Sequence, residues 1–280
     1  MNETTEEIDK ITKERDRWKD CATKLVESSG WHDLWPQAVA HYRKLKEELA
    51  SDWGSLVFYR MPSFVLAWAL IPTGVTPNQL TLLGVLLIPA MAAACWFLPP
   101  EQAMWVVTLL ALAFNVIDCA DGVLARATNQ NSLSGRYLDF ATDIFYRSVA
   151  YGCYGLIADR IWPGASFPWV AVGLCCAILV TYARVNRIYA EKLFAKSAPG
   201  TPGQRSLFDT GFSILSGLDT LLPLIAFLAW QLGGLWLAML WFLVYTLADA
   251  AVEVFGNYVK ARGIDSRGEG RGEHGTRAPP

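Results

Sequence analysis

Four aspartates lie close together in a part of the sequence that is otherwise apolar. Asp118, Asp121, Asp139 and Asp143 fall within the run DCADGVLARATNQNSLSGRYLDFATD. The first two are three residues apart and the last two are four apart, so on helices each pair shares a face. Carboxylates are costly in hydrocarbon and persist there when they are paired, bind a metal or line a wet cavity. Four converging acidic groups without a neighbouring histidine indicate divalent cations held by oxygen ligands.

The composition indicates that these carboxylates belong to an integral membrane protein. The chain has 280 residues, is 53% hydrophobic and contains 12 tryptophans. Its net charge of −2 does not indicate a nucleic-acid partner. Charged residues crowd residues 1–53 and 258–277, whereas long apolar runs fill the middle. The histidines lie outside the apolar core, which argues against a histidine-based nucleophile or a zinc site in the membrane: His32, His41 and His274.

The apolar runs predict an all-α fold with six transmembrane helices, since about 20 apolar residues span a bilayer. The expected spans are approximately 78–98, 102–126, 134–160, 166–193, 208–231 and 234–259. Thr76 and Gln79 predict a capping box at the first span, with Pro77 in the first turn. Residues 53–70 mix Trp, Tyr and Arg with apolar residues, which predicts an amphipathic helix in the membrane interface before the first span.

The distribution of basic residues predicts the orientation in the membrane. Loops on one side carry Arg60, Arg126, Arg136, Lys192, Lys196, Arg205, Lys260 and Arg262, and loops on the other carry only Arg160. The basic side is therefore expected to face the cytosol, together with both termini and the aspartates. The expected organisation is a charged cytosolic N-terminal segment (1–53), a six-helix membrane domain (54–260) and a disordered cytosolic tail (261–280).

The aspartate run resembles the signature of the CDP-alcohol phosphotransferase (CDP-alcohol phosphatidyltransferase) family. The pattern D-x2-D-G-x2-A-R-x8-G-x3-D-x3-D is matched by Asp118, Asp121, Gly122, Ala125, Arg126, Gly135, Asp139 and Asp143. A looser likeness covers about residues 57–260, while the first fifty residues match nothing familiar. The resemblance implies an enzyme that displaces CMP from a CDP-linked alcohol by attack of an acceptor hydroxyl.

The resemblance also implies roles for the motif residues. Two Mg²⁺ or Mn²⁺ ions would be held by Asp118, Asp121, Asp139 and Asp143, and Asp143 would also be the general base. The nucleotide would be bound by Asp121, Gly122, Ala125, Arg126, Gly135 and Asp139. Two alternatives stay open: the glycines could serve close helix packing, and Arg126 could be an interfacial arginine.

Further polar residues near the motif have more than one interpretation. Arg147, four residues after Asp143, could pair with it or face a substrate phosphate. Asn115, three residues before Asp118, could orient that aspartate. An acceptor phosphate site is expected at Arg184, Arg187 and Arg205, by likeness to family members with phosphorylated acceptors. The alternative for these arginines is the positive-inside bias alone.

The expected function is a step of phospholipid biosynthesis in a bacterial plasma membrane. CDP-diacylglycerol would donate a phosphatidyl group to a small polar alcohol, with inositol phosphate and glycerol phosphate as possible acceptors, and the family suggests a homodimer. The reverse arrangement, a CDP-linked headgroup given to a lipid alcohol, stays open. A prenyltransferase and a cation transporter are less favoured, because both acidic pairs lie in one hairpin and near the cytosolic ends of the spans.

Overall fold

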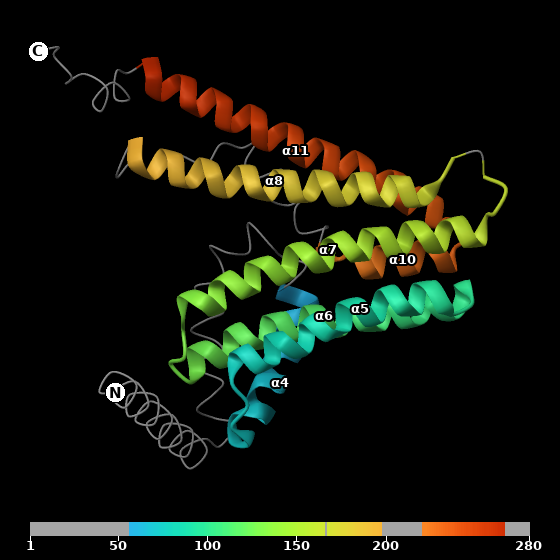
Figure 1. Cartoon of the computed structure of the whole chain (residues 1–280), viewed down its shortest axis with the longest axis horizontal. Coiled ribbons are helices and arrows are strands. Elements are labelled where there is room, and N and C mark those ends of the chain that lie inside the picture. The colour runs from blue at the N-terminus through green and yellow to red at the C-terminus, as the bar shows by residue number, and fades with distance from the viewer. Residues whose placement is uncertain (1–55, 166, 198–219, 267–280) are drawn as a thin grey trace, which may run out of the picture.

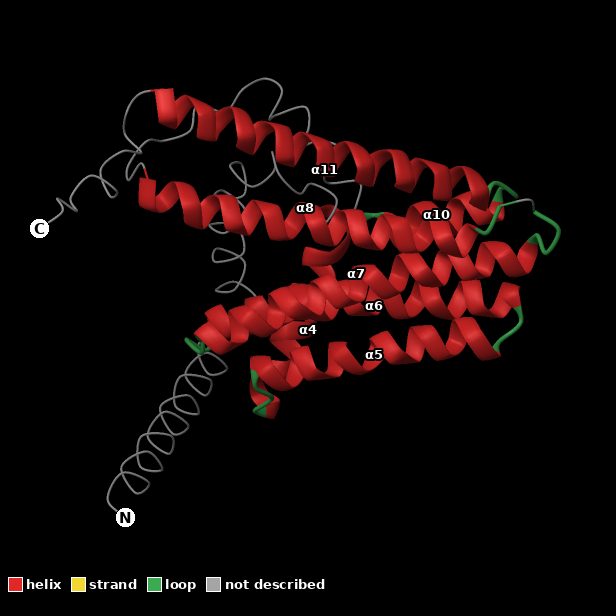
Figure 2. Cartoon of the chain, turned by 45° about the horizontal axis from the view of Figure 1, so that its top comes forward, coloured by secondary structure: helices red, strands yellow, loops and turns green. Residues whose placement is uncertain are grey.

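The computed structural model describes residues 56–165, 167–197 and 220–266, and within these ranges the chain is helical without strands (Figures 1 and 2). A π-helical turn, η1 (Leu56–Arg60), leads into α4 (Met61–Leu70) and a short 3-10 turn, η2 (Ile71–Thr73). The longer helices follow as α5 (Pro77–Phe97), α6 (Pro100–Ala127), α7 (Leu133–Ile161), α8 (Trp169–Ser197), α10 (Leu222–Gln231) and α11 (Leu235–Ser266). The prediction of an all-α fold is confirmed.

Local side-chain contacts fix where the helices begin. The predicted capping box at α5 is present: the Thr76 hydroxyl accepts from the Gln79 backbone N–H, and the Gln79 side chain accepts from the Thr76 N–H. At α7 the Ser132 hydroxyl accepts from the backbone N–H of Gly135 at 2.9 Å. At α8 the cap comes from the preceding helix instead. The Asp159 carboxylate of α7 accepts from the first backbone N–H groups of α8, which satisfies donors that a helix leaves unpaired.

The long helices form one packed bundle. Figure 1 shows α5, α6 and α7 side by side, with α8 and α11 as a neighbouring pair that diverges from α7 towards the end where α6 connects to α7. At the other end α7 and α8 approach closely. A Cβ atom at Gly155 would lie 2.5 Å from the Trp169 carbonyl oxygen, and one at Gly173 would overlap the Tyr151 carbonyl oxygen. Glycine at these two positions therefore sets the distance between α7 and α8.

In the part of the chain that the structure describes, four helices are long and apolar enough to cross a membrane: Pro77–Phe97, Pro100–Ala127, Trp169–Phe194 and Leu235–Ser266. By length and composition the chain is thus a multi-pass membrane protein. The helix α7 is long as well, but it carries charged residues along its length, such as Asp143, Arg147 and Asp159. The helix α10 covers only part of the expected span 208–231, and residues 208–219 lie outside the described residues. The count of six spans stays a prediction.

The segments outside the bundle are described in part. The helix α4 runs roughly across the direction of the long helices in Figure 1 and exposes Met61, Val65 and Trp68. Its placement in a membrane interface stays a prediction. The last helix continues to Ser266, past the expected domain boundary at 260. The expected N-terminal segment 1–53 and residues 267–280 of the expected tail lie outside the described residues.

Candidate active site

Two adjoining cavities open at the end of the bundle where α6 connects to α7. The larger has a volume of about 420 Å³ and lies between α4, α5, α6 and α7. The smaller has a volume of about 230 Å³ and is lined by residues of η1, α6, α7 and α8. Asp118, Cys119 and Asp139 line both. Asp118 and Asp139 therefore stand at the boundary between the two cavities.

The larger cavity gathers the whole set of residues expected to bind a nucleotide. Its lining includes Asp121, Gly122, Ala125, Arg126, Gly135 and Asp139. The first turn of α5 also reaches it through Pro77 and Asn78. Helix N-termini favour anions through their first backbone N–H groups, and in this turn the Asn78 N–H is the one left for an anion, because Pro77 has none and the Gln79 N–H donates to Thr76. A diphosphate is the kind of group that such a wall accommodates.

The carboxylate of Asp121 is held by a contact that the sequence does not reveal. The Thr81 hydroxyl of α5 lies 2.5 Å from Asp121 Oδ2 and 3.1 Å from the Pro77 carbonyl oxygen. Asp121 and Thr81 are both buried. Since a buried carboxylate needs hydrogen-bond donors, Thr81 supplies one and orients the side chain at the cavity wall.

The two motif glycines face polar side chains of the cavity wall. A Cβ atom at Gly122 would meet the end of the Arg126 side chain at 3.3 Å. A Cβ atom at Gly135 would lie 2.9 Å from the Ser132 hydroxyl and 3.3 Å from Asn78 Oδ1. Neither position is pressed against the backbone of another helix, in contrast to Gly155 and Gly173. The motif glycines therefore border the cavity and do not lie at a backbone contact between helices, and their nucleotide role stays a prediction.

Two arginines that the sequence did not assign to the nucleotide also line the larger cavity. Arg60 arrives from η1 and Arg136 from the first turn of α7. With Arg126 they bring three guanidinium groups to one cavity, a donor set suited to phosphate oxygens. Arg136 could have been found as a basic residue inside the motif run. Arg60 could not, because only the packing of η1 brings it there.

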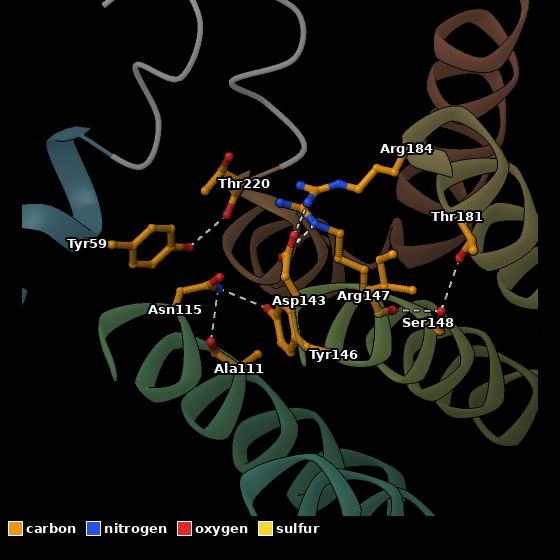
Figure 3. Close-up of polar contacts among 11 residues, drawn as sticks. Tyr59, Ala111, Asn115, Asp143, Tyr146, Arg147, Ser148, Thr181, Arg184 and Thr220 are labelled. Atoms are coloured by element: carbon orange, nitrogen blue, oxygen red, sulfur yellow. Dashed lines mark hydrogen bonds and ion pairs between the residues drawn. The ribbon is translucent and has the colours of Figure 1, made fainter. Parts of the chain in front are cut away.

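Asp143 lies in the smaller cavity between two arginines (Figure 3). Arg147 Nε donates to Asp143 Oδ1 at 3.0 Å within α7, and Arg184 of α8 forms an ion pair with Asp143 Oδ2. Of the two interpretations of Arg147, the structure thus shows the ion pair. The Asp143 side chain is only 16% exposed, and both of its carboxylate oxygens are engaged by guanidinium groups.

The other walls of the smaller cavity come from residues far apart in the sequence. Tyr59 of η1 is buried, and its hydroxyl donates to the Thr220 carbonyl oxygen at 3.0 Å. Asn115 of α6 donates to the Ala111 carbonyl oxygen and to the Tyr146 hydroxyl. The side chain of Asn115 is therefore connected to Tyr146 and not to Asp118, the partner suggested by the sequence. No local signal marks Tyr59 or Thr220, because their roles depend on helix packing.

The arginines expected to bind an acceptor phosphate separate in the structure. Arg184 lines the smaller cavity. Arg187, three residues later on α8, instead turns to α11, where it lies 3.0 Å from Glu253 Oε2 and 3.6 Å from Asp249 Oδ1. Arg205 lies outside the described residues. Arg147 joins Arg184 at the smaller cavity, so the described cationic pair there is Arg147 and Arg184.

The carboxylates provide the donor chemistry of a divalent-metal site. Asp121 lines the larger cavity, Asp143 the smaller, and Asp118 and Asp139 both. Carboxylate oxygens are the ligands that Mg²⁺ and Mn²⁺ prefer. Within the described ranges, however, no three His, Cys, Asp or Glu side chains lie close enough together to hold an ion. The donor types fit the expected ions, and the ligand set stays a prediction.

Comparisons with known proteins point to one family. The family described as CDP-alcohol phosphatidyltransferase matches residues 74–254. The chain is 31% identical over 123 residues to a "Bifunctional IPC transferase and DIPP synthase" of Aquifex aeolicus, a match that covers 43% of this chain and 27% of that protein. It is 28% identical over 160 residues to an "Archaetidylinositol phosphate synthase" of Pyrococcus horikoshii, covering 56% of this chain and 79% of that relative.

Proposed function

Because the chain belongs to the CDP-alcohol phosphatidyltransferase family, we propose that it transfers a phosphatidyl group from CDP-diacylglycerol to a polar alcohol and releases CMP. The chain is a transferase of phosphate-linked groups, as its relatives are. One observation supports the proposed donor and acceptor sites: Asp118 and Asp139 line both cavities. The larger cavity also contains every residue expected to bind the nucleotide, and the smaller contains Asp143 and two arginines.

In this proposal the larger cavity binds the donor. The cytidine diphosphate group would lie along α6, with Gly122 and Gly135 leaving room beside the carboxylates and Arg126 contacting the diphosphate. Arg60 and Arg136 would add charge-assisted hydrogen bonds to its oxygens. The lipid chains would leave the site between helices towards the bilayer.

The smaller cavity would bind the acceptor next to the donor phosphate. Asp143 would take the proton of the attacking hydroxyl. The new bond joins the acceptor oxygen to the phosphorus that carries diacylglycerol, and the bond from that phosphorus to CMP breaks. Mg²⁺ or Mn²⁺ held by the aspartates would neutralise charge on the diphosphate and on the departing CMP. The family is generally dependent on divalent metals, which supports this assignment.

A phosphorylated polyol is the acceptor class that the site supports best. Arg184 reaches Asp143 from α8 and could exchange that carboxylate for a phosphate oxygen, since guanidinium forks bind either group. The Pyrococcus relative is named for the synthesis of archaetidylinositol phosphate. We therefore propose inositol phosphate as the first acceptor to test. The expected orientation, with the site facing the cytosol, and the expected homodimer are part of the same proposal.

The test is CMP release by the purified protein with CDP-diacylglycerol, Mg²⁺ and one alcohol at a time: inositol phosphate, glycerol phosphate, serine or inositol. We expect release that depends on inositol phosphate, requires the divalent metal and is lost in Asp143→Asn. No release with any of these alcohols would contradict the proposal. CDP-linked headgroups with diacylglycerol would then be the donors and acceptor to test.

A further inference from the structure

The side-chain amide of Asn115 is held in one orientation at the wall of the smaller cavity. Its Nδ2 atom donates to the Ala111 carbonyl oxygen at 3.0 Å and to the Tyr146 hydroxyl at 2.9 Å. A backbone carbonyl can only accept a hydrogen bond, so the amide group that faces Ala111 must be the NH₂ group. Both N–H bonds of Asn115 are therefore used within the protein.

The partner of Asn115 is itself rigid. Tyr146 is buried, and its ring stacks on Phe114 with centroids 4.1 Å apart. Phe114 precedes Asn115 on α6, so the stacked ring and the hydrogen bond tie the same turn of α6 to α7. If the amide turned over, its oxygen would face the Ala111 carbonyl oxygen, so that hydrogen bond would be lost and two acceptors would oppose each other. Asn115 is thus a preorganised group and not a mobile surface side chain.

This arrangement leaves the Asn115 oxygen for something else. Figure 3 shows Oδ1 pointing away from both Ala111 and Tyr146. No side chain or backbone group in the described ranges donates to it. Asn115 lines the smaller cavity together with Asp143 and Arg184. A carbonyl oxygen at a cavity wall with its amide nitrogen already bonded is a fixed acceptor for a donor that enters the cavity.

We propose that Asn115 Oδ1 accepts a hydrogen bond from a second hydroxyl of the acceptor alcohol, one that does not react. The inference rests on the proposed function and narrows its substrate class. Arg184 would hold the acceptor's phosphate, Asp143 would face the reacting hydroxyl, and Asn115 would select a polyol over an alcohol with a single hydroxyl. Asn115 is therefore a specificity-determining residue that touches the substrate away from the bond that forms.

The test compares inositol phosphate with its monodeoxy analogues, each lacking one hydroxyl, in the wild-type protein and in Asn115→Ala. In the wild type we expect one analogue to lose about tenfold in kcat/KM, the size of one net hydrogen bond. In Asn115→Ala, inositol phosphate itself should fall by a similar factor, and the penalty for that analogue should disappear. The KM for CDP-diacylglycerol should change by less than about twofold in Asn115→Ala, because a single lost hydrogen bond to the acceptor leaves donor contacts in place.

Two further variants guard the interpretation. Asn115→Ser keeps a hydroxyl that can bond the Ala111 carbonyl four residues earlier but is too short to reach into the cavity, so it should behave as Asn115→Ala does. Phe140→Leu alters the same cavity without removing a polar group, and it should shift KM equally for all analogues. A penalty for the missing hydroxyl that survives in both Asn115 variants would overturn the inference. So would a wild-type protein that uses every deoxy analogue equally well.

These outcomes are separate from the fate of the proposed function. If inositol phosphate supports CMP release but the rate does not depend on Asn115, only the proposed hydrogen bond between Asn115 and the acceptor is contradicted. If folded wild-type protein in detergent releases no CMP with inositol phosphate or any of its analogues, the proposed acceptor and this inference are both contradicted.

Discussion

At the scale of single residues, the environment of Asp143 governs what the site can do. A carboxylate that faces two guanidinium groups has few lone pairs left for a metal ion or for a hydroxyl proton. If the phosphate of an acceptor paired with Arg184, the Asp143 Oδ2 atom would be released from its ion pair. Binding of a phosphorylated acceptor and readiness of the base would then be coupled through Arg184.

Replacement of Arg184 should therefore act mainly on the acceptor. In Arg184→Gln we expect the KM for inositol phosphate to rise about 10- to 100-fold, the range for a hydrogen bond to a charged group. The KM for CDP-diacylglycerol should change little. The readout is steady-state CMP release with each substrate varied in turn.

Arg187→Gln is the matched comparison on the same helix. Arg187 is engaged by Glu253 and Asp249 of α11, so its loss should raise the acceptor KM much less than the loss of Arg184 does. Equal effects of the two substitutions, or no effect of Arg184→Gln, would argue against an acceptor phosphate at Arg184.

Thr81 provides a second prediction at the residue scale. In Thr81→Val the Asp121 carboxylate loses its hydroxyl partner, at a cost of about 1–3 kcal/mol for an unsatisfied buried group. We expect weaker donor binding and a higher requirement for Mg²⁺, measured as CMP release against metal concentration.

Thr108→Val serves as the control for Thr81→Val. Thr108 is also a buried threonine, but it faces Tyr154 and lines neither cavity. Its replacement should lower thermal stability without changing the Mg²⁺ requirement. If both variants shifted the metal requirement alike, the Thr81 effect would be one of general stability.

At the scale of helices, the site depends on how α7 and α8 are joined. The carboxylate of Asp143 is on α7, whereas Arg184 is on α8, and the two helices meet where Gly155 and Gly173 allow backbone contact. The Asp159 cap at the start of α8 strengthens the same end of the pair. A firm contact there and divergence at the other end leave room for the smaller cavity between them.

Gly173→Ala should separate these helices. Its new Cβ atom would overlap the Tyr151 carbonyl oxygen, and overpacking of this kind costs about 1–3 kcal/mol. We expect a lower Tm in detergent, followed by a loss of acceptor binding as Arg184 moves away from Asp143.

Gly152→Ala is the control for this substitution, because a Cβ atom at Gly152 meets nothing within 4 Å. It should leave Tm unchanged or raise it slightly, since alanine favours the helix over glycine. A fall in Tm of equal size in both variants would mean that glycine matters here for a reason other than helix contact.

At the scale of the whole molecule, the charge distribution predicts which end of the bundle faces the cytosol. The loop between α6 and α7, beside the cavities, should lie on the basic, cytosolic side, and the loop between α7 and α8 on the opposite side. Single cysteines at Asn131 and Gly164, in a background with the native cysteines replaced, test this orientation. Both positions lie in the connections between helices.

With a membrane-impermeant maleimide we expect intact cells to label the cysteine at position 164 and not the one at 131. Broken cells should label both. Labelling of position 131 in intact cells would show that the orientation is opposite to the proposed one. The site would then face away from substrates in the cytosol.

The features predicted from the sequence are those that depend on neighbouring residues. Thr76 and Gln79 form their capping box because the partners lie within one helical turn. The motif residues likewise line two adjoining cavities, Asp143 in the smaller and the others in the larger, because α6 and α7 form a hairpin with a short connection. The helical class could also be predicted, because each helix satisfies its own backbone hydrogen bonds and apolar runs of this length have few alternatives to helices in a membrane.

Only the tertiary structure decided which distant residues complete the cavities and which arginines are engaged elsewhere. Tyr59 meets Thr220 across 161 positions of the chain, and Arg187 turns to α11 although it lies only three residues after Arg184. Side chains three apart on a helix point in directions that differ by about 60°, so the packing of neighbouring helices determines what each one meets. Local spacing determines the motif and the helix starts, whereas the packed faces determine the second cavity, its fixed Asn115 oxygen and the partners of Asp143.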